Sequence, residues 1–300
     1  MGLSIGVMLS VLRSTRPEDL RSNARHAEDL GLDALFVGDH LAATVPILDS
    51  TLTVATVAAV TQRIGLGFGV MIPALRGPVW AAKQVATLQE LSGDRVILGV
   101  GSGGDPHGAV GWEAAGVPYA ERGRLTDAAL AVLPGLIAGK PTRLDSGAEV
   151  TLAPGAQVPP VWVGGNSARA QRRAVGHGTG WFPSMLLPDD VARGARRLAD
   201  LAEADDRGRP APTIAVGGSV LLGEDAPRAL LDQFAVGVRD YGIPAETASQ
   251  LAITGSPAQA AERLTRYVEA GASHLVVGVI GDGWPRQCEL LAKARALLDG

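Results

Sequence analysis

The chain has 300 residues, 46% hydrophobic and 19% charged, which suffices for a large core and differs from the composition of disordered proteins. Its formal net charge of −4 argues against a nucleic-acid or anionic-membrane binder, because such proteins need a basic surface. Cys288 is the only cysteine, which excludes an intramolecular disulfide and a cysteine-based zinc cluster and favours a reducing, cytoplasmic location.

The amino-terminal apolar stretch, Leu3–Leu12, is short and has no basic residue before it. It is therefore predicted to contain a first strand and not a signal peptide. No later window reaches the roughly 18 uninterrupted apolar residues of a transmembrane helix, so no membrane span is predicted.

Short apolar runs alternate with helical patterns along the chain, as expected for parallel strands covered on both faces. The predicted strands are Leu3–Leu9, Ala34–Gly38, Ile64–Val70, Arg95–Val100, Pro160–Gly164, Gly180–Phe182, Thr213–Leu222 and Ser273–Ile280. Capping boxes predict helix starts at Thr15–Glu18 and Ser256–Gln259. An apolar stripe predicts a helix from Val191 to Leu201, and Pro285 marks the start of a last helix.

This alternation predicts a (β/α)8 TIM barrel that forms one domain over residues 1–300. A doubly wound open sheet is the alternative fold. Residues 139–160 contain four prolines and are predicted to be a variable insertion before the fifth strand. Residues 103–117 form a long glycine-rich loop after the fourth strand, and loops of this length are commonly lids or binding loops.

Active sites of such barrels lie at the carboxyl ends of the strands. The residues expected there are Met8, Asp39, His40, Gly69, Val70, Gly101, Ser102, Gly164, Gly165 and Trp181. The many glycines would let a flat ligand lie against bare backbone. His40 is a candidate to transfer or stabilise a proton, with Asp39 binding a ring N–H or orienting a loop. The alternative is that Asp39 caps a turn and His40 is a solvated loop residue.

Two glycine motifs have phosphate-binding potential. Gly99–Gly104 matches G-x-G-x-x-G, but no helix start follows it, so a Rossmann dinucleotide site is only an alternative. Gly164–Ser167 precedes a predicted helix, and the free N–H groups at the start of a helix favour the binding of an anion such as phosphate. Asn166 or Ser167 could also serve as an ordinary N-cap of this helix, and the two interpretations are compatible. The arginines at 169, 172, 173, 193, 196 and 197 are predicted to lie on solvated helix faces. The histidines show no metal-ligand spacing, so no metal is expected.

The sequence as a whole resembles the bacterial luciferase-like family of flavin and deazaflavin oxidoreductases. The first match is the segment EDLGLDALFVGDHL at residues 28–41. Further matches, in order, are Arg63–Val70 with Pro73, Ala82–Gln84, Leu91–Arg95, Leu98–Gly101, Ala115–Pro118 with Glu121–Gly123, Gly164–Gly165 and Gly180–Pro183.

The resemblance implies a (β/α)8 barrel that holds an isoalloxazine-type ring across the strand ends. It implies ring-plane contacts at Gly69 and Val70, joined by a cis peptide bond that forms a bulge, and a homodimeric assembly. Contacts with the edge or tail of the cofactor are implied at Asp39, Ser102 and Gly103. The phosphate group of the cofactor is expected at Gly164, Gly165 and Asn166. His40 is implied to be the proton donor or anion stabiliser. The insertion at 139–160 is expected to shape the pocket.

Three motifs are most similar to the branch that uses the deazaflavin coenzyme F420: Asp39-His40, Gly69-Val70 and Gly180–Pro183. The implied function is hydride transfer between F420 and a small organic substrate. The alternatives are an FMN-dependent luciferase-like monooxygenase and a non-catalytic cofactor-binding barrel. The sugar-phosphate dehydrogenases of the F420 branch carry a catalytic Glu where Gly104 stands and an aromatic residue where Thr44 stands. These departures argue against a glucose-6-phosphate substrate.

Overall fold

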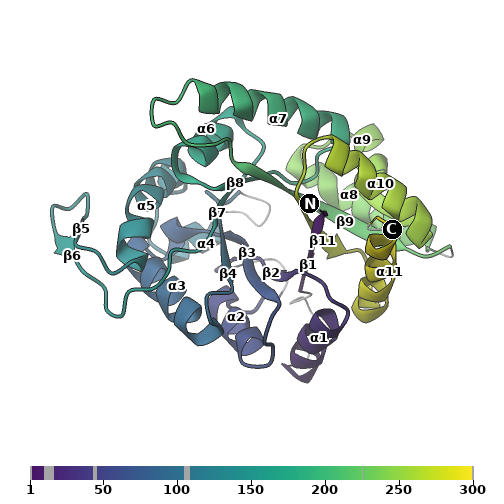
Figure 1. The fold of residues 1–300 in the computed structure, drawn as a ribbon, viewed down its shortest axis with the longest axis horizontal. Helices are drawn as coiled ribbons and strands as arrows, with labels where there is room; N and C mark the ends of the chain where they lie inside the picture. The colour runs from purple at the N-terminus through teal and green to yellow at the C-terminus, as the bar shows by residue number, and fades with distance from the viewer. Residues whose placement is uncertain (1, 10–16, 43–45, 105–108, 225, 299–300) are drawn as a thin grey trace.

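The computed structural model describes residues 2–9, 17–42, 46–104, 109–224 and 226–298. Within them, parallel strands close into a barrel surrounded by helices (Figure 1). The barrel strands are β1 (Ser4–Met8), β2 (Ala34–Val37), β3 (Gly65–Met71), β4 (Val96–Val100), β7 (Val161–Gly164), β8 (Gly180–Phe182), β9 (Thr213–Leu222) and β11 (His274–Val279). Pairing of β1 with β11 and of β9 with both β8 and β11 closes the sheet. The predicted TIM barrel is confirmed, and the open-sheet alternative is wrong.

Helices occupy the outside of the barrel and connect its strands (Figure 1). They are α1 (Pro17–Asp29), α2 (Ser50–Ala58), α3 (Pro78–Ser92), α4 (Val110–Ala114), α5 (Arg122–Ile137), α6 (Ala168–His177), α7 (Pro188–Glu203), α8 (Arg228–Gly237), α9 (Ala245–Leu251), α10 (Pro257–Glu269) and α11 (Trp284–Ala296), with short 3-10 turns η1 (Pro73–Leu75), η2 (Tyr119–Glu121) and η3 (Val238–Tyr241). None of the helices in the described ranges has the length and hydropathy needed to cross a membrane.

Local signals in the sequence explain where several helices begin. Ser256 caps α10 through a complete capping box, as predicted: its hydroxyl accepts from the Gln259 N–H, and the Gln259 side chain accepts from the Ser256 N–H. Ser167 caps α6 by accepting from the Ala170 N–H. The predicted box at the start of α1 includes Thr15, which lies outside the described residues.

The barrel interior is filled by aromatic rings that face glycines. The rings of Phe36 and Trp162 stack with centroids 5.7 Å apart, and Phe182 packs against both. A Cβ at Gly67 would lie 2.2 Å from the Phe36 ring, and a Cβ at Gly180 would lie 2.4 Å from Trp162. These glycines therefore give space to aromatic side chains of the core, a complementarity that only the folded barrel reveals.

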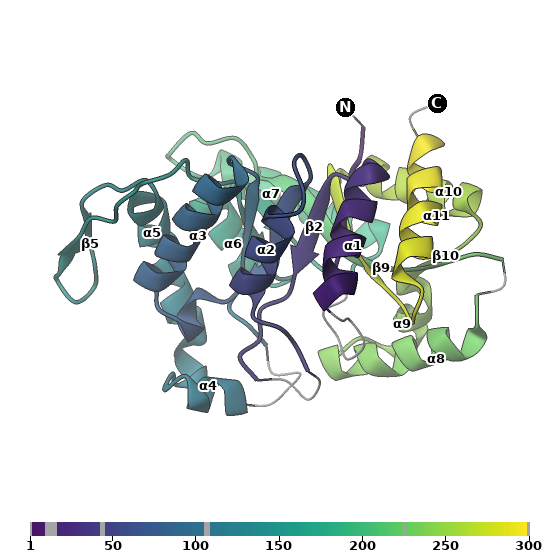
Figure 2. The same cartoon turned by 90° about the horizontal axis from the view of Figure 1, so that it is seen from below.

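Three strands lie outside the eightfold pattern. A short strand, β10 (Ala252–Gly255), pairs with the carboxyl half of β9. Within the predicted insertion, β5 (Thr142–Arg143) and β6 (Glu149–Val150) form an antiparallel hairpin that extends from the barrel beside α5 (Figure 2). None of the three was predicted, because they lie outside the strand–helix alternation on which the prediction was based.

Candidate active site

The carboxyl ends of the barrel strands surround a cavity of about 780 Å³. This volume lies within the range of small-molecule and cofactor sites. The described residues that line it are Met8, Asp39–Ala42, Gly69, Val70, Ile72, Leu75, Gly101–Gly104, Gly111, Trp112, Gly164, Gly165, Phe182, Ser184, Met185, Gly217–Ser219, Val276 and Gly278. All of the predicted site residues except Asn166 and Trp181 are among them. The predicted loop over residues 103–117 includes residues 105–108, which lie outside the described residues.

A bulge in β3 places Val70 at the floor of the cavity. The Gly69–Val70 peptide bond is cis, as the resemblance implied, and the register of β3 against β4 shifts between Phe68 and Met71. A Cβ at Gly101 would lie 2.4 Å from Val70 Cγ2, and a Cβ at Gly164 would lie 2.8 Å from Val70 Cγ1. Both glycines therefore accommodate the Val70 side chain, and both also line the cavity, as predicted.

Bare backbone also lines the cavity on two strands where it was not predicted. Gly218 on β9 and Gly278 on β11 border the cavity, and a Cβ at either would have no neighbour closer than 3.8 Å. A side chain there would project into the open space, so these two strands form a cradle for a flat ligand. The signal was the Gly217-Gly218-Ser219 interruption of an otherwise apolar strand.

Asp39 and His40 follow β2 directly and both border the cavity. The Asp39 side chain is only 3% exposed and forms an ion pair with Arg76, which lies just beyond η1. His40 is the single imidazole among the described lining residues. The structure therefore brings the predicted proton-transfer group to the cavity, and it adds Arg76, which had no distinguishing sequence signal.

Another part of the cavity lining comes from the loop after β4 and from α4. Gly103 has a left-handed φ of 66°, and a Cβ there would lie 2.7 Å from the Trp112 ring. Trp112 packs with Ile72 and Ala74 in a small apolar cluster. Because this glycine motif ends the fourth strand of a closed barrel, the Rossmann alternative is wrong.

The predicted phosphate site lies where β7 meets α6. Gly164 and Gly165 line the cavity, but the Gly165 N–H donates to the Phe182 carbonyl at 3.2 Å. The Asn166 side chain bridges to Ser184, donating to its carbonyl at 2.9 Å and accepting from its N–H at 3.1 Å. The Asn166 side chain thus joins two strand ends, and what remains to attract an anion is the positive end of α6.

Two predicted side-chain environments differ in the structure. Trp181 was placed among the strand-end residues, yet it is buried outside the cavity, and its Nε1 donates to the Gly165 carbonyl at 2.8 Å. Phe182 lines the cavity instead.

Arg173 was expected on a solvated face but is buried: it contacts both carboxylate oxygens of Asp127 and lowers the pKa of that carboxyl.

Charge is sparse around the cavity. Its described lining includes Asp39 and His40 but neither lysine nor arginine. The described residues also contain no group of three or more His, Cys, Asp or Glu side chains arranged to hold a metal ion. A ligand that fills this cavity meets mainly apolar side chains and backbone amides.

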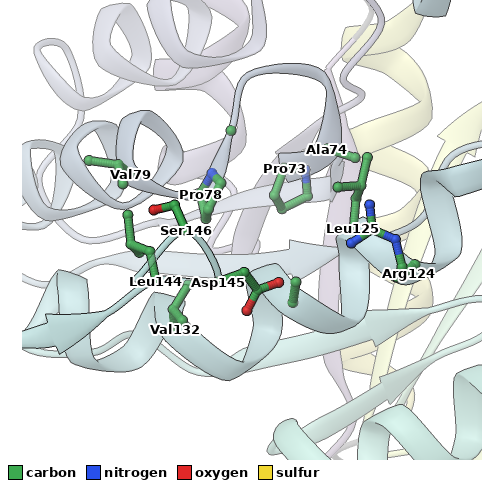
Figure 3. Close-up of a pocket in the computed structure, with 12 residues that line it drawn as sticks. Pro73, Ala74, Pro78, Val79, Arg124, Leu125, Val132, Leu144, Asp145 and Ser146 are labelled. Atoms are coloured by element: carbon green, nitrogen blue, oxygen red, sulfur yellow. The ribbon is translucent and has the colours of Figure 1, made fainter. Parts of the chain in front are cut away.

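The inserted hairpin does not reach this cavity. None of the described residues 139–160 lines it, so the expectation that the insertion shapes the pocket is wrong. Leu144, Asp145 and Ser146 border a second, mainly apolar cavity of about 300 Å³ against η1, α3 and α5 (Figure 3). η1 contributes to both cavities: Pro73 and Ala74 border the second and Leu75 the first.

Comparisons with known proteins agree with this architecture. An F420-dependent glucose-6-phosphate dehydrogenase from Beutenbergia cavernae is 30% identical, with 87% of this chain and 87% of that protein covered. A 5,10-methylenetetrahydromethanopterin reductase from Archaeoglobus fulgidus is 25% identical, with 92% and 94% covered.

Solved structures support the same fold. An F420-dependent secondary alcohol dehydrogenase in complex with an F420-acetone adduct superposes with a TM-score of 0.80 at 18% identity, covering 99% of both chains. The FMN-bound oxygenating constituent of 3,6-diketocamphane monooxygenase from Pseudomonas putida superposes with a TM-score of 0.79 at 19% identity, again covering 99% of both. The family model described as luciferase-like monooxygenase matches residues 4–241. The chain therefore belongs to the luciferase-like monooxygenase family.

Proposed function

We propose that this protein is an F420-dependent oxidoreductase that transfers a hydride between the deazaflavin and a small organic substrate. The observation that carries the proposal is the cavity of about 780 Å³, with Val70 at its floor and bare backbone at Gly218 and Gly278. Such a surface fits a flat ring, and relatives that match most of the chain are named as F420-dependent enzymes.

The bound deazaflavin supplies a ring carbon that accepts or delivers a hydride. In this proposal Gly69 and Val70 support the ring plane, and Ser102 and Gly103 contact the ring edge. His40 holds or delivers the proton that accompanies the hydride at the substrate oxygen or carbon, a role suited to an imidazole near neutral pH. The apolar wall around Trp112 excludes water from this region.

The anionic tail of the cofactor is proposed to lie toward Gly164, Gly165 and Asn166. The described lining provides no cationic side chain, so the amino-terminal end of α6 is the source of positive potential there. A helix terminus stabilises an anion by about 0.3–1 kcal/mol at exposed sites and more where water is excluded.

The substrate is proposed to differ from glucose 6-phosphate, although a relative is named for that activity. Gly104, where the sugar-phosphate enzymes carry a catalytic acid, lines the cavity and supplies no side chain. Thr44, the other departure, lies outside the described residues. A phosphate ester would also meet no Lys or Arg among the described lining residues.

Titration of the purified protein with each cofactor tests the proposal. Quenching of F420 fluorescence at micromolar concentrations, with much weaker binding of FMN, is the expected result. Binding of FMN alone would replace the proposal with an FMN-dependent monooxygenase. That second candidate is favoured by the description of the family model and by the FMN-bound neighbour.

The catalytic role of His40 is tested separately from cofactor binding. His40→Ala is expected to retain F420 affinity within about threefold while lowering the turnover of any substrate found by 10²–10⁴-fold, the usual contribution of general acid–base catalysis. Unchanged turnover in this variant would contradict the assignment. If no substrate is turned over by either protein, a non-catalytic cofactor-binding barrel becomes the better interpretation.

We further propose that the protein is a cytoplasmic homodimer that assembles through the outer face of α2 and α3. This face exposes Leu52 at 70%, Trp80 at 68% and Leu91 at 67%, and α2 carries no charged side chain. Large exposed apolar residues on neighbouring helices are typical of an interaction surface. Trp80→Glu is expected to yield a monomer in sedimentation experiments, whereas a wild-type monomer would contradict the proposal.

A further inference from the structure

All hydrogen-bonding positions of the Asp39 carboxylate are used within the protein. Oδ1 accepts from the Ser50 hydroxyl at 2.8 Å and from Arg76 Nη2 at 2.7 Å. Oδ2 accepts from the Ile72 N–H at 2.8 Å and from Arg76 Nη1 at 2.8 Å. A carboxylate offers about four lone-pair sites, so these four donors saturate it. It has no site left for a donor on a bound ligand.

These bonds connect three segments that surround the cavity. Asp39 precedes His40 at the end of β2, and Ser50 is the first residue of α2. Ile72 and Arg76 flank η1, the turn that follows the bulge at Val70. Because Ile72 and Leu75 line the cavity, the position of η1 determines one of its walls.

We propose that Arg76 is a positioning residue that acts through Asp39. The ion pair holds η1 and the bulge against the strand end that carries His40, and it keeps the Asp39 side chain from contacting the cofactor directly. This inference rests on the proposed function, since it concerns the same cavity. Of the two roles predicted for Asp39, this proposal favours orienting a loop over binding a ring N–H.

The chemistry of arginine suits this role. Its planar guanidinium forms two parallel bonds to one carboxylate, which fixes both distance and orientation. It also compensates a charge that is almost fully buried. A lysine at the same place would supply the charge through one ammonium group but not the paired geometry.

The test compares F420 affinity among variants of the full-length protein by fluorescence titration. Arg76→Met is expected to weaken F420 binding by about tenfold or more, as displaced supporting residues commonly do. Arg76→Lys is expected to restore part of the loss. The decisive variant combines Asp39→Asn with Arg76→Met. It removes the uncompensated buried carboxylate and is expected to bind F420 more tightly than Arg76→Met alone.

The alternative, direct contact between the Asp39 carboxylate and the cofactor, predicts the opposite sign. Adding Asp39→Asn to Arg76→Met would then remove a further contact and weaken binding again, and this result would overturn the proposal. If Arg76→Met does not fold, Arg76→Lys and the double variant are compared instead: equal affinity of Arg76→Lys and the wild type would also overturn it.

Two control measurements separate the role of Arg76 from a general effect of replacing an arginine and from the choice of cofactor. Arg286→Met, on an arginine that is 70% exposed on α11, is the matched control and is expected to bind like the wild type. If the wild type binds FMN and not F420, the proposed function fails, and the same comparison of single and double variants with FMN still decides the role of Arg76.

Discussion

Val70 lines the cavity and limits which residues fit at two neighbouring positions. Glycines on two neighbouring strands leave space for it: a Cβ at Gly101 would lie 2.4 Å, and one at Gly164 2.8 Å, from its methyl groups. A larger residue at either position must displace Val70 or the backbone. Gly101 and Gly164 are thus explained by packing around one side chain.

We therefore predict that Gly101→Ala destabilises the protein by about 1–3 kcal/mol, the usual cost of overpacking. Val70→Ala in the same chain is expected to recover most of this loss, because it removes the methyl groups that the new Cβ meets. Urea unfolding of the single and double variants measures both effects. Purely additive losses would show that Val70 is not the residue in conflict.

Gly218→Ala is predicted to behave differently, since a Cβ there meets no atom closer than 3.8 Å. Its free energy of unfolding is expected to stay within about 0.5 kcal/mol of the wild type. The new methyl group projects into the cavity, so F420 affinity is expected to fall. Unchanged affinity, measured by the same fluorescence titration, would place the ring away from β9.

At the scale of secondary structure, the barrel strands were predictable because parallel strands buried on both faces are almost continuously apolar. Thr213–Leu222 and Gly180–Phe182 were predicted with their exact bounds. The strands β5, β6 and β10 were missed because they lie outside the regular strand–helix alternation and are defined by their pairing partners. The Asp39–Arg76 pair was missed for the same reason, since only the fold brings residues 37 positions apart together.

The helix starts illustrate how far local chemistry alone determines an element. Ser256 at the N-cap of α10 accepts from the Gln259 N–H, so Ser256→Ala is predicted to lower the free energy of unfolding by about 1 kcal/mol. Thermal unfolding should show a decrease of about 2–4 °C. Ser249→Ala, within the short helix α9, is the control and should leave the midpoint nearly unchanged. An equal effect of both variants would contradict the capping role.

At the scale of the whole molecule, the two ends of the barrel differ in chemistry. Cofactor and proton transfer are proposed at the carboxyl ends of the strands, whereas His274 is the first residue of β11 and His177 is the last of α6. His274 lies 4.7 Å from the Trp162 ring centroid and contacts the Ser273 hydroxyl through Nδ1. Burial lowers the pKa of His274, and burial together with Arg207 and Arg209 lowers that of His177.

These shifts predict how stability depends on pH. Below the ordinary histidine pKa of about 6.5, the unfolded chain binds protons that the folded chain does not, so the free energy of unfolding falls as the pH is lowered. The free energy of unfolding continues to fall until the pH passes the lowered pKa values of the two histidines in the folded protein.

His274→Phe keeps an aromatic ring beside Trp162 and removes one of these two histidines. The decline in the free energy of unfolding between pH 7 and 5 should therefore become shallower. Urea unfolding across this range measures the slope, and F420 affinity should not change, because His274 lies outside the described lining of the cavity. An identical slope in the variant would show that His274 protonates equally in the folded and unfolded chain.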